Sequence, residues 1–253
     1  MKKTIFVCLC FVQTLIFANE HLILPDTNIN GIKPSPNVSL SDFFISANIF
    51  LLNYVVDGKV NYTGVSADKI SINELVNNIA NADLNNADKN TRLSFYLNAY
   101  NLLVIKNVVD NLPLNKPIDV IGFFDKKTFE VAGSYMTLNV LENNKLRPDP
   151  RVHFALVCAA KGCPQIMNEA FFPDKVQTQL DALTVNALNN AAFIKVDDKS
   201  KTVKISKIFD WYQDDFIKVS GSAINYINAK RTTPIPASYA VEFYEYDWSL
   251  NGK

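Results

Sequence analysis

The chain has 253 residues, of which 48% are apolar and 20% charged, enough for a domain with a sizeable core. Its 25 lysines and arginines balance its 25 aspartates and glutamates, so the formal net charge is zero. This balance, without any long basic run, argues against a nucleic-acid binder, which needs a clustered positive field.

The first residues resemble a secretory leader. Lys2 and Lys3 form a basic start, an apolar stretch follows, and Ala18 is a suitable cleavage residue. A membrane anchor is the alternative. Ile16, two residues before Ala18, is larger than the small residue usually found at that position of a cleavage site. We predict a signal peptide over 1–18, export to the periplasm or outside the cell, and no transmembrane span in the mature chain.

The next elements are predicted from polarity and helical spacing. The segment 19–41 is polar and interrupted by prolines, which indicates a loose N-terminal segment. A helix is expected over 42–56, with Ser41 as its N-cap. A turn with a short extended piece follows over 58–65, and a second helix over 66–82.

The central part combines the longest helix with shorter elements. Apolar and aromatic residues recur at helical spacing over 89–112, and Pro113 ends the pattern. The segment 127–138 reads as a hairpin, and 139–147 as a short helix. The apolar and β-branched residues of 152–158 predict a buried strand.

The remaining segments alternate between helices and strands. Helices are expected over 173–191, 208–219 and 222–230, a hairpin over 192–206, and a closing strand over 239–248.

No repeat or linker divides the chain after residue 42. We therefore predict a single globular domain over 42–253. Its expected class is α+β, mainly helical, with a small and mostly antiparallel sheet.

Three residues in this domain could carry thiol or imidazole chemistry: His153, Cys158 and Cys163. On a strand, His153 and Cys158 would point to opposite faces. Cys163 precedes Pro164, a good first-turn residue, and a helix start favours the thiolate. Cys163 is therefore the better nucleophile candidate, and His153 is the candidate base.

Three other interpretations of these residues stay open. Cys158 and Cys163 could form a disulfide, which an oxidising compartment would favour. They could also be two buried free thiols that act as small hydrophobic side chains. A zinc site with His153 is the third, although no fourth ligand is obvious. We expect no metal and no cofactor.

A second group of candidates lies in "YLNAYN" on the longest helix. Asn98 and Asn101 share one helix face and could form a structural amide network, or orient the imidazole and stabilise an oxyanion. Tyr100 is a binding candidate. If His153 is buried it needs a hydrogen-bond partner, and Tyr100 or Asn101 is expected to supply it.

A third group surrounds the predicted strand. Glu142 and Arg147 could form a buried carboxylate–guanidinium pair that fixes the entry to the strand, and both are binding candidates. The alternative is a solvated charged face that also includes Asp149 and Arg151.

Four segments in order resemble one family. They are SFYLNAYNLLVIKNVV, MTLNVLENNKLRPDPRVHFALVCAAKGCPQI, KIFDWYQDDF and YEYDWSLNG. Together they are similar to domain-of-unknown-function family 547, and LLNYVVDGKVNYTGV resembles its start, so that the resemblance covers roughly 43–251. The family name assigns no activity.

The resemblance implies an α+β domain and places a set of polar and sulfur-containing residues in family motifs. They are Asn98, Tyr100, Asn101, Glu142, Arg147, Arg151, His153, Cys158, Cys163 and Pro164. One position departs from the pattern, because Leu141-Glu142-Asn143 stands where the family usually has Ile-Glu-His. If that His is a general base, this chain lacks it.

These observations lead to two main hypotheses. The first is an exported thiol-dependent hydrolase or acyl transferase acting on a peptide-like amide or a thiol peptide. Cys158 or Cys163 would attack the carbonyl, and His153 would transfer the proton. Asn98 or Asn101 would orient the imidazole of His153 or stabilise the oxyanion.

The alternative is a non-enzymatic secreted or periplasmic binding or interaction module in which the cysteines are joined. The partner is then a small peptide-like molecule or another protein. A third class, a redox or metal-handling protein, would need the cysteine pair to be reversibly oxidised or metallated.

Overall fold

The longest helix forms the centre of the hydrophobic core. In the computed structural model, which describes residues 38–253, α4 (Lys89–Asp110) is buried on all sides from residue 94 to 105. Asp88 caps its start by accepting a hydrogen bond from the Thr91 amide at 2.8 Å. The helix ends before Pro113, so the prediction for 89–112 is confirmed.

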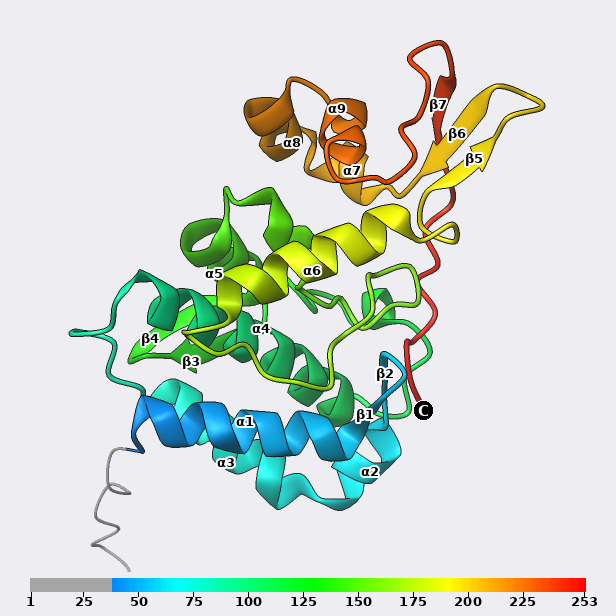
Figure 1. Cartoon of the computed structure of the whole chain (residues 1–253). Helices are drawn as coiled ribbons and strands as arrows, with labels where there is room; N and C mark the ends of the chain where they lie inside the picture. Colours follow the sequence, from blue (N-terminus) through cyan, green and yellow to red (C-terminus); the bar gives the residue numbers. More distant parts are fainter. Residues whose placement is uncertain (1–37) are drawn as a thin grey trace, which may run out of the picture. The chain divides into compact units, whose positions relative to one another are not determined.

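The residues before α4 form three helices and a short hairpin. These elements are α1 (Leu40–Tyr54), β1 (Val55–Val56), β2 (Lys59–Val60), α2 (Tyr62–Ala67) and α3 (Lys69–Ala80) (Figure 1). The two predicted helices are confirmed in outline. The predicted N-cap Ser41 is wrong, because Ser39 accepts the Asp42 amide hydrogen bond and starts α1 earlier. The extended piece predicted over 58–65 becomes helical from Tyr62, where Asn61 caps α2.

The residues after α4 lead to the site through a hairpin and two helical turns. They comprise η1 (Pro117–Asp119), β3 (Thr128–Val131), β4 (Ser134–Thr137), α5 (Leu138–Leu141) and the π-helical turn η2 (Glu142–Leu146). The predicted hairpin is confirmed, with β3 and β4 antiparallel. The short helix predicted over 139–147 is confirmed as α5 continued by η2.

The buried strand predicted over 152–158 is wrong. Residues Pro150–Phe154 form the 3₁₀-helix η3, capped by Asp149, and the backbone beyond it is irregular. The amides of Ala155 and Leu156 both donate to the Val152 carbonyl at 2.9 Å. These local turns use the hydrogen-bonding groups that a strand would share with a neighbour, so apolar content alone did not distinguish the two structures.

The C-terminal elements form a helix, a small sheet and a helical cap. They are α6 (Val176–Asn189), β5 (Lys195–Asp197), β6 (Thr202–Ile205), α7 (Ile208–Trp211), α8 (Gln213–Ser220), α9 (Ala223–Asn228) and β7 (Ala240–Phe243). Within the sheet β5 pairs antiparallel with β6, while β7 pairs with β6 in parallel. The closing strand predicted over 239–248 is shorter in the structure, where β7 ends at Phe243. The mainly helical α+β class with small, mostly antiparallel sheets is confirmed.

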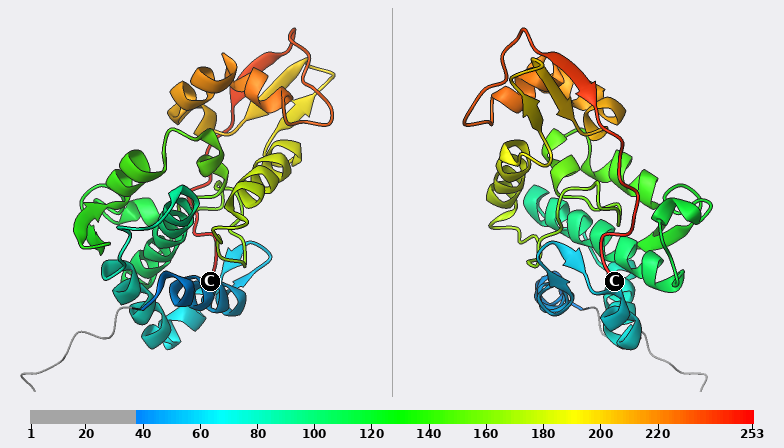
Figure 2. Two further views of the ribbon diagram at one scale, coloured as in Figure 1. Left: turned by 60° about the vertical axis from the view of Figure 1, so that its left-hand side comes forward. Right: turned by 90° about the vertical axis from the view of Figure 1, so that its right-hand side faces the viewer.

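The segment after β7 returns along the molecule to the first hairpin, as both views of Figure 2 show. The Asn251 amide donates to the Ala159 carbonyl at 2.9 Å, and Gly252 forms a parallel bridge with Val60. The buried Tyr62 hydroxyl donates to the Asn251 side chain at 2.7 Å. Residues 247–251 lie beside the loop that contains both cysteines, because the amides of Lys161 and Gly162 also donate to the carbonyls of Ser249 and Asp247.

Carboxamide side chains on α4 hold irregular backbone in place. The Asn101 Nδ2 donates to the Ala155 carbonyl and its Oδ1 accepts from the Val157 amide, both at 3.0 Å. Asn98 pairs in the same way with the amide and carbonyl of Phe171, at 2.9 and 2.8 Å. Each carboxamide thus supplies the donor and acceptor that a neighbouring strand would otherwise provide.

Within the described residues no helix is both long and apolar enough to cross a membrane. The predicted signal peptide over 1–18 lies outside this part of the chain, as does most of the segment 19–41.

We predict that Asn101→Ala lowers the free energy of unfolding by about 2–4 kcal/mol, because it leaves a buried amide and a buried carbonyl without partners. Urea denaturation with the cysteines oxidised measures this change. Asn81→Ala is the matched control: Asn81 is exposed at the end of α3, and among the described residues its side chain bonds to Asn77 alone. The control should cost less than about 0.5 kcal/mol. Equal effects of the two substitutions would contradict the structural role of Asn101.

Candidate functional site

The strongest candidate site is a pocket of about 350 Å³ between the central core and the C-terminal elements. Six aromatic side chains line it, from Tyr100, Phe124, Trp211, Tyr212, Tyr246 and Trp248, together with the aliphatic Leu156, Val157 and Ile208. Polar groups also line it, namely Asp125, Asn139, Glu142 and His153, together with Cys158 and Cys163. An apolar cavity of this size with a few converging polar groups is the usual form of a small-molecule site.

His153 is buried beside two carboxylates. Its Nε2 lies 2.8 Å from Oδ2 of Asp215, and its Nδ1 lies 3.8 Å from Oε1 of Glu142. The imidazole stacks on the Tyr212 ring with 3.9 Å between centroids. Burial lowers the pKa of His153 to about 4, although Asp215 acts in the opposite direction. The neutral imidazole therefore donates from Nε2 to Asp215, and its Nδ1 carries no proton and lies too far from Glu142 for a hydrogen bond.

The prediction that His153 is shielded from solvent is confirmed, since only 4% of the residue is exposed. The expected partners were wrong, because Asp215 takes the hydrogen bond that Tyr100 or Asn101 was expected to supply. Asp215 lies on α8, 62 residues away, where no local sequence pattern connects it to His153.

The sequence had suggested that Arg147 pairs with Glu142. In the structure Arg147 pairs with Asp215 instead. Its Nε donates to Oδ2 at 2.7 Å and its Nη2 to Oδ1 at 3.0 Å, a bidentate pair. Burial alone would raise the pKa of Asp215, but the hydrogen bonds from Arg147 and His153 outweigh it and leave the pKa below its usual value. Asp215 is therefore an anion that positions both Arg147 and His153.

Asn143, at the position where the family pattern has His, also contacts Arg147. Its Oδ1 accepts from Nη1 at 2.6 Å, and its Nδ2 donates to the Asn139 carbonyl. The side chain thus supports the ion pair of Arg147. Arg151 forms a separate group with Asp149, at 2.7 Å, and Asp181, at 3.2 Å.

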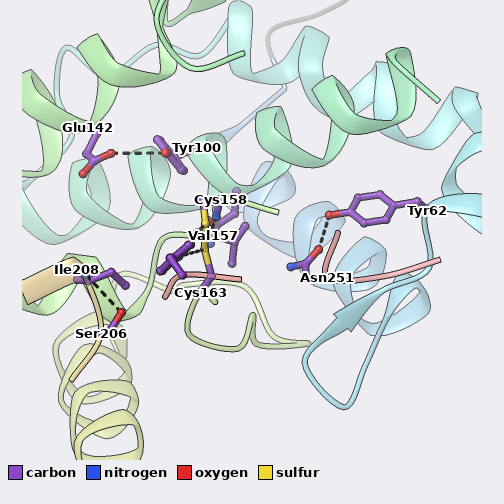
Figure 3. The surroundings of a disulfide bond; sticks show 11 residues. Tyr62, Tyr100, Glu142, Val157, Cys158, Cys163, Ser206, Ile208 and Asn251 are labelled. Carbon is purple, nitrogen blue, oxygen red and sulfur yellow. Dashed lines mark hydrogen bonds between the residues drawn. A yellow bond between two sulfur atoms is a disulfide. The ribbon is translucent and has the colours of Figure 1, made fainter. Parts of the chain in front are cut away.

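Glu142 lies at the polar base of the pocket. Its Oε2 is 3.5 Å from the Tyr100 hydroxyl, which donates to it, as Figure 3 shows. Burial raises the pKa of Glu142 above its usual value, and hydrogen bonding from Tyr212 and the charge of Arg147 only partly offset this. Glu142 and His153 therefore form a pair in which burial disfavours both charged forms.

Cys158 and Cys163 are joined as a disulfide (Figure 3). In this form neither sulfur is a thiolate. The helix start predicted at Cys163 is wrong, because the next helix, α6, begins only at Val176. Among the described residues, no cluster of His, Cys, Asp or Glu is arranged to hold a metal ion.

One hydroxyl group contacts both sulfurs. Tyr246 Oη lies 3.1 Å from Sγ of Cys158 and 3.1 Å from Sγ of Cys163. Because disulfide sulfurs carry no hydrogen, Tyr246 is the donor in both contacts. The Cys158 amide also donates to Sγ of Cys163, at 2.9 Å.

The loop between the cysteines is shaped to admit the Tyr246 ring. The amides of Lys161 and Gly162 donate to the carbonyls of Ser249 and Asp247, both at 2.8 Å. A Cβ atom at Gly162 would lie 3.0 Å from three ring atoms of Tyr246. Glycine at this position therefore lets the ring pack directly on the loop.

The sequence candidates divide into two groups in the structure. Tyr100, Glu142, His153 and both cysteines line one pocket. Asn98, Asn101 and Arg147 lie outside its lining, and the carboxamides of both asparagines are occupied by loop backbone.

Sequence reasoning did not single out several site residues: Asp125, Asn139, Trp211, Tyr212, Asp215, Tyr246 and Trp248. The available signal was the pair of aromatic and acidic motifs KIFDWYQDDF and YEYDWSLNG, which contain five of these seven.

The comparison with known proteins finds a family match for the central part of the chain. No curated protein and no solved structure matches it. Residues 84–188 match a family model described as "Protein of unknown function, DUF547". The match includes α4, Glu142, His153 and both cysteines, whereas the motifs around Trp211 and Tyr246 lie beyond it. The resemblance predicted from the motifs is thus confirmed over 84–188, where the chain is similar to this family.

Proposed function

We propose that the chain is an exported binding module that holds a small peptide-like ligand in the aromatic pocket beside the Cys158–Cys163 disulfide. The observation that carries this proposal is the pocket itself, about 350 Å³ in volume, with aromatic side chains in its wall and the buried Glu142 and His153 among its polar groups. Its volume suits a ligand of a few residues or less.

The polar base favours an uncharged amide over an ion. The pKa of His153 is lowered to about 4 by burial, so its imidazole is neutral at neutral pH. Burial also raises the pKa of Glu142, which disfavours its carboxylate form. A peptide amide offers one donor and one acceptor, which match the mixed hydrogen-bonding groups of Glu142, Asn139 and Tyr212 along the lining.

The aromatic walls provide the apolar contact surface. Tyr246 lies 4.9 Å from both Trp211 and Trp248 between ring centroids, so the three rings form one cluster. Trp211 is 46% exposed, although a ring of this size is usually more deeply buried. Amphipathic rings of this kind give large contact areas at low cost in side-chain entropy, which supports ligand binding.

The disulfide supports the exported location. Such bonds persist in oxidising compartments and are rare where thiols are kept reduced. The two cysteines are only five residues apart, so the chain-entropy gain of joining them is about 2 kcal/mol.

A thiol-dependent hydrolase or acyl transferase is the second candidate function. One observation favours it: both cysteine sulfurs and the imidazole of His153 line the same pocket. In a reduced form, one cysteine would attack the carbonyl of a peptide-like amide and His153 would transfer the proton.

We predict that S-methylglutathione, a tripeptide with a blocked thiol, binds the pocket and changes the tryptophan fluorescence. Both tryptophans of the chain line the pocket, so the emission reports on this site. Trp211→Ala should weaken binding at least about tenfold, because it removes a central aromatic contact. Calorimetric titration measures the change independently of the fluorophore.

Tyr135→Ala is the matched control for this titration. Tyr135 is 75% exposed on β4 and lies outside the pocket lining, so its loss should leave the affinity unchanged. Equal affinities of the Trp211→Ala variant and the unmodified chain would refute peptide binding in this pocket.

We predict that His153 remains neutral on acidification until about pH 4. The unfolded chain takes up this proton near pH 6.5, so between these values the unfolded state binds more protons and acid destabilises the fold. Relative to His153→Gln, the unmodified chain should lose up to about 3 kcal/mol of unfolding free energy from pH 7 to pH 4. Parallel pH profiles of the two proteins would contradict the lowered pKa.

For the second candidate, we predict that Cys163→Ser reduces any hydrolysis by the reduced protein more than Glu142→Gln does. A serine hydroxyl stays protonated, so the covalent route is lost. Cys158→Ser is the comparison: if it abolishes turnover and Cys163→Ser does not, the two cysteines exchange roles. Full activity of both serine variants on peptide and thiol-peptide amides would eliminate the thiol mechanism.

A further inference from the structure

We propose that the Cys158–Cys163 disulfide is a thiol–disulfide exchange centre, in which a thiol entering the pocket attacks Sγ of Cys158 and Cys163 is the leaving group. The inference deepens the proposed function, on which it rests for one point: the pocket that holds a peptide-like ligand also brings a ligand thiol to the disulfide.

The disulfide is open to a ligand on the pocket side. Both cysteines line the pocket and are only partly buried, whereas their neighbours Ala159 and Ala160 are fully buried. Exchange requires access of a thiolate to one of the two sulfurs, so a disulfide in a pocket wall is placed for reaction.

The hydrogen bonds at the two sulfurs are unequal. Sγ of Cys163 accepts from the Cys158 amide at 2.9 Å and from the Tyr246 hydroxyl at 3.1 Å. Among residues 38–253, the donor at Sγ of Cys158 is the shared Tyr246 hydroxyl alone, at 3.1 Å. Two donors lower the energy of a developing negative charge more than a shared one, so the geometry favours charge on Cys163. Since exchange is faster when the departing sulfur is the better anion, Cys158 is the sulfur attacked.

The donors are held in place before any thiol arrives. Tyr246 is fixed by its packing against Gly162 and by the backbone hydrogen bonds of residues 247 and 249. Burial raises the pKa of Tyr246, so its hydroxyl keeps its proton and serves as a donor throughout the exchange.

The reaction balances with a low-molecular-weight thiol as the reductant. The thiolate forms a bond to Sγ of Cys158 while the bond between Cys158 and Cys163 breaks, and the proton lost by the incoming thiol ends on Cys163. A second thiol attacks the ligand sulfur of the mixed disulfide and releases a ligand disulfide and the dithiol protein. Two thiols are thus oxidised as the protein disulfide is reduced, and a ligand disulfide reverses both steps.

The test is to treat the oxidised chain with glutathione, alkylate the free thiols and map the products after trypsin digestion. Lys161 lies between the two cysteines, so cleavage separates residues 152–161 from 162–175. Glutathione is expected on the peptide of Cys158 and the alkyl group on that of Cys163. The opposite pattern would overturn the assigned direction, and an unreacted disulfide would overturn the proposal.

Tyr246→Phe tests the role of the hydroxyl while retaining the ring. It should slow the exchange at least about tenfold, the effect of losing one hydrogen bond to a developing charge. Tyr239→Phe is the control, because Tyr239 donates to Asp198 at an exposed position and does not line the pocket. Equal rates for the two variants would overturn the role of Tyr246, and unchanged thermal unfolding of Tyr246→Phe shows that its fold is intact.

A parallel reaction with 2-mercaptoethanol separates this inference from peptide binding. This thiol contains no amide, so its exchange depends on the disulfide and its donors alone. Exchange with 2-mercaptoethanol, but no affinity for S-methylglutathione, would refute the binding proposal and retain the exchange centre. Binding of S-methylglutathione without exchange by either thiol would refute the exchange centre and retain the binding proposal.

Discussion

The two hydrogen bonds between Asn101 and the backbone of residues 155–157 hold the part of the chain on which the site depends. This segment connects His153 to Cys158 and has no helix or strand of its own beyond Phe154. Because α4 is buried on all sides, a polar side chain on it is fixed in position by the core. Through its two hydrogen bonds, Asn101 holds the irregular backbone in place relative to α4.

Asp215 plays a corresponding part among the charged groups. It accepts two hydrogen bonds from Arg147 and one from the imidazole of His153. The carboxylate is thus compensated on both sides, and burial leaves His153 neutral. The Asp215 carboxylate thus connects helix α8 to the turn η3 and holds α8 beside His153.

The sequence predicted the helices well because their apolar spacing and proline stops are local signals. The family resemblance was also recognisable, since its motifs are contiguous. The 3₁₀-turn at His153 was not predicted, because a run such as VHFALVC is equally apolar in a strand and in irregular buried backbone. The irregular backbone is held by the carboxamide of Asn101, more than fifty residues away along the chain.

The site itself was predicted in part, for a similar reason. Tyr100, Glu142, His153 and both cysteines were recognised by residue type within short motifs. Asp215 and Tyr246 were missed, because they lie 62 residues from His153 and 83 residues from Cys163 and act only through the folded structure. Likewise, the pairing of Arg147 with Asp215 depends on where the fold places α8, and not on the spacing of Arg147 to Glu142.

The distance along the chain between the cysteines and Tyr246 has a consequence for the order in which the site is made. During synthesis both cysteines emerge together, five residues apart, and can be oxidised at once. Tyr246 is added 83 residues later, and only then does the disulfide acquire its hydroxyl donor. The surroundings of the two sulfur atoms are therefore completed only when the C-terminal segment has packed onto the loop between the cysteines.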